Sequence, residues 1–247
     1  VMAQRLSIPL DPEDNLAQGG ATTGAYNINK PLRQALGLTP DAPIRGVLMQ
    51  VDAVLARMPA LDPQALYVIW AGGHDFGGYL DFGQPDVVAS PPAANIRLAI
   101  ERLADAGARS FVIGNMPDLG STPAYYGTEK GALATRLVTE YNRGLSQAAA
   151  EARQAGGLII FELDAAGIFA ELAVYPERFG IRVVGEAYLP MDYIDFGDPL
   201  APAKPLPANR SGQSADDYMM FWAVAAGRKV HAVLGGRAVA MVAGVAR

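Results

Sequence analysis

The 247-residue chain contains no cysteine. This absence excludes disulfide bonds, thiolate metal ligands and a cysteine nucleophile, although it leaves the cellular compartment open. The chain has two histidines, His74 and His231, which are far apart in the sequence. Without a His-x-x-x-His pair or a thiolate, the sequence predicts no metal site and points to no cofactor.

The chain also lacks clusters of positive charge and long apolar runs. Its formal net charge is −5, which argues against nucleic acid or an anionic membrane surface as the main partner. No apolar run is long enough to predict a transmembrane segment. The first ten residues lack the charged-then-apolar pattern of a signal peptide, so the sequence does not fix the localisation.

Hydrophobic residues make up 51% of the chain, enough for a sizeable core. Three compact apolar runs, at residues 66–71, 110–115 and 157–161, are typical of strands covered on both faces. Helical spacing of apolar residues surrounds them, within residues 44–58, 96–107 and 133–156 and from about residue 227 to the C-terminus. This order predicts right-handed crossovers and a parallel sheet between helices.

We therefore expect one α/β domain over residues 1–247. Residues 181–217 are rich in Pro, Gly, Asp and Tyr and show no sustained period. They are interpreted as a long irregular surface excursion of that domain and not as a second domain.

Polar residues follow the predicted strands. Gly72, Gly73, His74 and Asp75 follow the first run, and Asn115 ends the second. The carboxyl ends of parallel strands open onto a crevice where α/β proteins bind ligands. Asp118, Asp164 and the pair Asp216-Asp217 also lie in loops or near strand ends, but Asp in such places more often caps a turn or helix than acts as a catalytic carboxylate.

A second glycine-rich stretch reads Asn-Leu-Ala-Gln-Gly-Gly-Ala-Thr-Thr at residues 15–23. Its paired glycines either form a simple turn or let backbone N–H groups approach an anion. Five further segments follow it in the chain, at residues 67–75, 112–123, 141–145, 169–180 and 221–222. In this order the six segments resemble the motif blocks of the GDSL-type (SGNH) ester hydrolases. The resemblance covers most of the chain, from about residue 15 to residue 231.

The resemblance implies a flavodoxin-like three-layer α/β/α fold and an oxyanion-binding crevice. In this family the second glycine of the first matching block donates an N–H to the oxyanion, a role that carries over to Gly20. The family's next block ends Gly-x-Asn-Asp, and its Asn also donates to the oxyanion. Here that position holds His74, whose ring either donates toward an anionic oxygen or bonds a neighbouring loop carbonyl. The expected crevice residues are Gly20, Gly73, His74, Asp75 and Asn115.

The same resemblance implies a Ser nucleophile, a His base and an orienting Asp. No Gly-Asp-Ser block occurs before residue 15, where Ser7 is the one serine. Aligned on Phe221, the family's Asp and His positions hold Ala223 and Ala226. His231 falls inside a helical apolar pattern and is interpreted as a structural helix histidine.

The sequence therefore predicts a member of the ester hydrolase (lipase/esterase) family that is inactive as written, with no catalytic residue identified. The alternative is a non-catalytic relative that binds an acyl or glycan ligand. The family's nucleophile-bearing first strand is not recognisable in this chain. Its absence would leave the strand at residues 66–71 as a sheet edge, so we expect marginal stability or self-association through that edge.

Overall fold

The structure is a computed structural model that describes residues 2–29, 44–83, 91–189, 210 and 212–245. Its central sheet has the order β1-β2-β3, with β1 at Leu66–Ile69, β2 at Ser110–Gly114 and β3 at Ile159–Leu163. Both pairings are parallel, with Tyr67 opposite Phe111 and Phe111 opposite Ile160. The three strands and their parallel pairing confirm what the apolar runs predicted.

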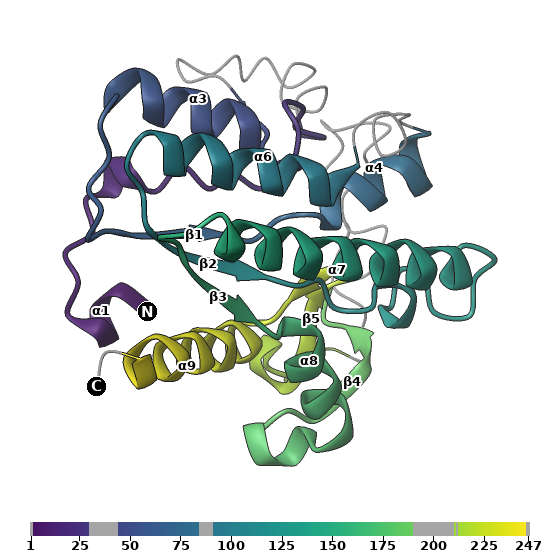
Figure 1. The fold of residues 1–247 in the computed structure, drawn as a ribbon. Helices are drawn as coiled ribbons and strands as arrows, with labels where there is room; N and C mark the ends of the chain where they lie inside the picture. Colours follow the sequence, from purple (N-terminus) through teal and green to yellow (C-terminus); the bar gives the residue numbers. More distant parts are fainter. Residues whose placement is uncertain (1, 30–43, 84–90, 190–209, 211, 246–247) are drawn as a thin grey trace.

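Helices cover the sheet on both sides, giving three layers (Figure 1). One face carries α3 (Val47–Arg57), α6 (Pro92–Asp105) and α7 (Gly131–Gln154), each of which has a stripe of buried residues. On the other face α9 (Arg228–Val245) packs against β3, and the short α1 (Met2–Leu6) packs against α9. The expected α/β/α architecture is thus confirmed.

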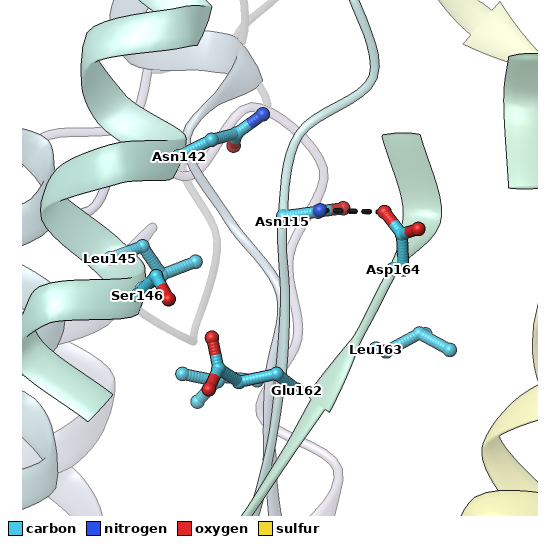
Figure 2. Close-up of a pocket in the computed structure, with 8 residues that line it drawn as sticks. Asn115, Asn142, Leu145, Ser146, Glu162, Leu163 and Asp164 are labelled. Atoms are coloured by element: carbon cyan, nitrogen blue, oxygen red, sulfur yellow. Dashed lines mark hydrogen bonds between the residues drawn. The ribbon is translucent and has the colours of Figure 1, made fainter. Parts of the chain in front are cut away.

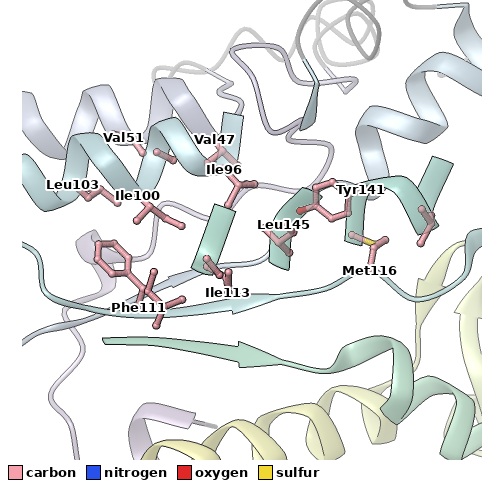
Figure 3. Packing of buried hydrophobic residues seen from close by; sticks show 14 of the residues in the cluster. Val47, Val51, Ile96, Ile100, Leu103, Phe111, Ile113, Met116, Tyr141 and Leu145 are labelled. Carbon is pink, nitrogen blue, oxygen red and sulfur yellow. The ribbon is translucent and has the colours of Figure 1, made fainter. Parts of the chain in front are cut away.

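The main core lies between the sheet and the first helical layer (Figure 3). Phe111 and Ile113 lie on the same face of β2 and pack in one cluster with Ile100 of α6 and Leu145 of α7. All four are almost fully buried. Because burial of such a side chain contributes about 1.5–3 kcal/mol, this layer anchors the strand ends that carry the site.

The second face of the sheet is covered unevenly. Val112 of β2 is buried, as expected for a strand covered on both faces, but Val68 of β1 is 54% exposed. The prediction that all three strands are covered on both faces is therefore wrong for β1. The reason is the position of α9, which packs on β3 and leaves Val68 open. Among the described residues no strand pairs with the outer side of β1.

A smaller sheet follows, with β4 at Val183–Ala187, β5 at Tyr218–Trp222 and β6 at Ala225–Ala226. β4 runs parallel to β5, and β6 pairs antiparallel to β5. The segment 181–217, expected to be irregular throughout, thus contains a strand. The sequence did not predict β4 because its five residues are too few to show a hydrophobic period. Its partner strand β5 also begins more than thirty residues after the start of β4. Residues 190–209 of that segment lie outside the described part of the chain.

The small sheet has its own core, which includes Met220 of β5 and Val230 of α9. Leu172 from α8 (Ala165–Val174) is fully buried there. Leu163, at the end of β3, packs against the same cluster and joins it to the central sheet.

Candidate functional site

The end of β1 leads into α4 (Gly73–Phe82) through Gly72, whose φ of 130° is a conformation that only glycine adopts readily. A Cβ there would lie 3.1 Å from the ring of Tyr141. The Tyr141 hydroxyl donates a 2.7 Å hydrogen bond to the carbonyl of Ala71, and burial raises the pKa of its phenol, so the donor stays protonated. Helix α7 therefore fixes the turn that the two glycines predicted.

The glycine-rich stretch at residues 15–23 lies against α4, to which Thr23 is hydrogen-bonded through Asp75. Gly20 is buried and has a φ of 83°. A Cβ on it would lie 2.5 Å from Oδ1 of Asn27. The amide of Asn27 in turn donates to the carbonyls of Gly19 and Arg45, at 3.1 and 3.3 Å. The close approach of Asn27 requires glycine at position 20.

A buried carboxylate joins this loop to α4. Asp75, only 6% exposed, accepts hydrogen bonds from the backbone N–H of Thr23 at 2.9 Å and from its hydroxyl at 2.7 Å. Asn95 of α6 donates to the same hydroxyl at 3.0 Å. Asp75 was expected at this site from the sequence, whereas Thr23 and Asn95 were not. The available signal for Asn95 was a polar residue directly before Ile96, on the buried stripe of a helix.

Several backbone N–H groups in the glycine-rich loop and at the start of α4 have no acceptor among the described residues. In the part of the chain that the structure describes, no hydrogen bond uses the N–H of Gly20, Gly73 or His74. Helix geometry leaves the first N–H groups of α4 unpaired, and the partial positive charge there favours an anion. The loop and the helix start therefore present donors of the kind that bind a carboxylate or an oxyanion.

His74 is the second residue of α4. His74 is exposed to solvent, and no described residue hydrogen-bonds its imidazole. Desolvation by the surrounding protein lowers the pKa of His74 below its ordinary value of 6.5. Near pH 7 the ring is consequently neutral and offers one N–H donor and one acceptor nitrogen.

Asn115 points to a different place from the other four predicted residues. Its Nδ2 donates to Oδ1 of Asp164 at 2.8 Å, and its Oδ1 accepts from the N–H of Ala166 at 2.8 Å. Asp164 itself caps α8 by accepting from the N–H of Gly167. The hydrogen bonds of Thr23 to Asp75 thus join the glycine-rich loop that contains Gly20 to α4, which begins Gly73-His74-Asp75. The Asn115 side chain helps instead to hold the start of α8.

Figure 2 shows the cavity beside Asn115, between α7 and the ends of β2 and β3. It has a volume of about 200 Å³. Asn142 lines it, but both ends of that amide are already occupied by the backbone N–H and carbonyl of Met116, at 2.8 Å each. Ser146 and Glu162 also face this space (Figure 2), and no histidine lines it. Among the described residues that line the cavity, Ser146 therefore shares the space with carboxylates and not with an imidazole.

The positions that the family resemblance assigns to acid and base carry no titratable side chain. Ala223 is buried, and its carbonyl accepts from the N–H of Ala124 at 3.3 Å. Ala226 ends β6. His231 lies in α9, as its apolar neighbours predicted, with its ring edge-on to Trp70 at a centroid distance of 6.4 Å.

Within the described residues, no group of three His, Asp or Glu side chains is arranged to hold a metal ion. A search of the same residues finds no helix long and apolar enough to cross a membrane.

Comparison with protein families gives a match to the model of GDSL-like Lipase/Acylhydrolase over residues 1–174. The chain belongs to this family. The matched range includes the glycine-rich loop, β1, α4 and β2, and so contains the whole crevice described above.

Curated relatives agree with this assignment. An "Uncharacterized protein in trpE-trpG intergenic region" of Pseudomonas putida is 29% identical over 68% of this chain and 28% of its own length. Phosphatidylcholine-sterol acyltransferase of Aeromonas hydrophila is 26% identical over 68% of this chain and 47% of its own length. Esterase EstA of Pseudomonas aeruginosa is 36% identical over 49% of this chain and 18% of its own length. The chain thus spans less than half the length of each of these relatives.

Proposed function

We propose that this chain keeps the oxyanion-binding half of a GDSL ester hydrolase and that, as a 247-residue polypeptide, it binds an acyl carboxylate or ester carbonyl without hydrolysing it. The observation that carries the proposal is that the N–H groups of Gly20, Gly73 and His74 have no acceptor within the described part of the chain. Donors aimed at one region of space are what a carboxylate or a developing oxyanion requires.

The absence of turnover follows from the residues at the acid and base positions. Ala223 and Ala226 can neither orient an imidazole nor accept a proton. Ser7 directly follows α1 and has no strand-to-helix turn before it. His74 lies in the first turn of α4, and no described serine is hydrogen-bonded to it. Acyl transfer to serine needs nucleophile and base within hydrogen-bonding reach of one another.

An ester-cleavage assay with 4-nitrophenyl butyrate tests the catalytic half of this proposal. We expect the purified chain to release 4-nitrophenol at the rate of buffer alone, and the double substitution Ala223→Asp and Ala226→His to restore nothing. Turnover above background that is lost in His74→Ala would overturn the proposal. Rescue by the double substitution would show that a nucleophile is present after all.

Titration of the ¹⁵N-labelled chain with butyrate tests the binding half. The amide signals of Gly20, Gly73 and His74 should shift with one common dissociation constant. Butyrate is the matching probe because free N–H groups at a helix start favour a negative charge over a neutral hydroxyl. The alternative, a glycan-binding relative, predicts the opposite selectivity, with shifts caused by a neutral sugar such as maltose and none by butyrate.

We also propose that the chain associates with a second copy through the outer side of β1. This proposal is supported by the exposed Val68 and by the absence of any charged residue between positions 63 and 74. An unpaired strand without charges is a template for pairing with another strand.

A further inference from the structure

Two segments that are far apart in the sequence carry the crevice donors, and a single carboxylate connects them. Gly20 lies three residues before Thr23, and His74 lies directly before Asp75. The hydrogen bonds from the N–H and the hydroxyl of Thr23 to Asp75 therefore set the spacing between the two groups of donors.

The loop is fastened to its other neighbour by different means. The N–H of Val47, at the start of α3, donates to the carbonyl of Thr22 at 2.9 Å, and the N–H of Leu48 donates to the carbonyl of Gly24 at 3.1 Å. These backbone bonds hold the loop to α3 and would remain if Asp75 were replaced. They do not hold it to α4.

We infer that Asp75 is a positioning residue: its carboxylate locks the Gly20 loop against the start of α4, so that donors from both segments act on one anionic oxygen atom of the ligand. The inference rests on the proposed function, because it explains how the same crevice is kept ready for an anion. Pre-set donors cost no rearrangement when the ligand arrives, and this is the main source of their effect on a developing charge.

Because Asp75 is a carboxylate, the inference can be tested by whether removal of its charge strengthens or weakens anion binding. A buried carboxylate close to an anion site repels the anion, so a purely electrostatic role predicts that its neutralisation strengthens binding. A positioning role predicts the reverse. The Thr23 donors that face Asp75 are occupied by it, whereas the N–H of Gly20 has no acceptor among the residues that the structure describes.

The experiment is the butyrate titration, followed by NMR, of four variants. Asp75→Asn removes the charge, and Thr23→Val removes the hydroxyl donor while keeping the charge. Thr23→Ser keeps both donors and serves as the conservative rescue. Ile168→Val, in the separate core beneath α8, is a mild destabilisation away from the crevice.

We expect Asp75→Asn and Thr23→Val to weaken butyrate binding at least tenfold, and to end the common titration of Gly20 and His74. Thr23→Ser and Ile168→Val should stay within about twofold of the unmodified chain. Equal or tighter binding by Asp75→Asn would overturn the inference, and so would an unchanged affinity in Thr23→Val.

A second measurement separates this inference from the proposed function. If the unmodified chain does not bind butyrate, the proposed function fails, and amide hydrogen exchange without ligand then decides the inference. The amides of Ala21 and Thr22, which are hydrogen-bonded within the loop, should exchange at least tenfold faster in Asp75→Asn and Thr23→Val than in Ile168→Val. Equal exchange in all three variants would show that Asp75 does not position the loop.

Discussion

Gly20 shows how a single residue sets the shape of the crevice. Its positive φ already disfavours any other residue by about 1–2 kcal/mol. A Cβ would also press on Asn27 and Asn29, whose nearest atoms are 2.5 and 2.6 Å from its ideal position. The glycine is therefore required both by the backbone conformation and by the lack of space.

The first prediction compares two Gly→Ala substitutions by thermal or urea unfolding. Gly20→Ala should lower the free energy of unfolding by about 3 kcal/mol, since backbone strain and displacement of Asn27 add together. Gly127→Ala is the matched control, because Gly127 also has a positive φ (71°) but open space around its Cβ position. It should cost about 1 kcal/mol. Equal losses in the two variants would contradict the predicted close packing at Gly20.

His74 gives a prediction about pH. Desolvation lowers its pKa in the folded chain, so below about pH 6.5 the unfolded chain binds more protons at this position than the folded chain does. Stability is therefore lost as the pH falls from 7.5 through the ordinary pKa of histidine. His74→Asn should remove part of this loss, which melting temperatures at pH 7.5, 6.5 and 5.5 would reveal. Parallel pH profiles for the variant and the unmodified chain would rule out a desolvated ring.

At the scale of elements, Asn142 ties α7 to the turn that follows β2. Its side chain satisfies the N–H and the carbonyl of Met116, both at 2.8 Å. Asn142→Leu would leave two backbone groups without partners, and it should cost about 2–4 kcal/mol in urea unfolding. Thr139→Ala, on the exposed side of the same helix, should change stability by less than about 0.5 kcal/mol. A loss for Asn142→Leu no larger than that for Thr139→Ala would mean that the turn holds without α7.

The elements with strong local patterns were predictable from the sequence. β1, β2 and β3 were visible as compact apolar runs, and α3, α6 and α7 as stripes at helical spacing. β4 was not, because a five-residue strand whose partner lies far along the chain leaves no local pattern. Its pairing depends on contacts that only the folded chain makes.

The candidate site was also predictable only where a local pattern marks it. The glycines of the crevice were visible because turns and close approaches demand that residue type. The side-chain direction of Asn115 was not, since its position at a strand end fits either the crevice or the start of α8. The hydrogen bonds of Thr23 with Asp75 and Asn95 join three segments spread over more than seventy residues, and no local rule connects them.

At the scale of the whole molecule, no described strand pairs with the outer edge of the central sheet. β1 pairs with β2 on one side only, among the residues that the structure describes. Val68 is 54% and Trp70 38% exposed beside that edge. Two copies related by a two-fold axis would place the same strand antiparallel to itself, which satisfies the unpaired N–H and carbonyl groups of both.

The last prediction follows from this geometry. Val68→Lys places a like charge at the same point of both copies, and it should raise the dissociation constant at least tenfold in sedimentation equilibrium at micromolar concentrations. Lysine is a residue by which natural sheets protect such edges. Val174→Lys is the matched control, because Val174 is 64% exposed at the end of α8 and should leave the association unchanged.

The melting temperature gives an independent measure of the same equilibrium. Association of folded copies stabilises the folded state by mass action, so the melting temperature of the unmodified chain should rise with protein concentration. That of Val68→Lys should not. If the unmodified chain is monomeric at every concentration and melts at one temperature, the open edge of β1 does not drive association. If Val68→Lys and Val174→Lys weaken association equally, the contact lies elsewhere on the surface and added charge alone explains the effect.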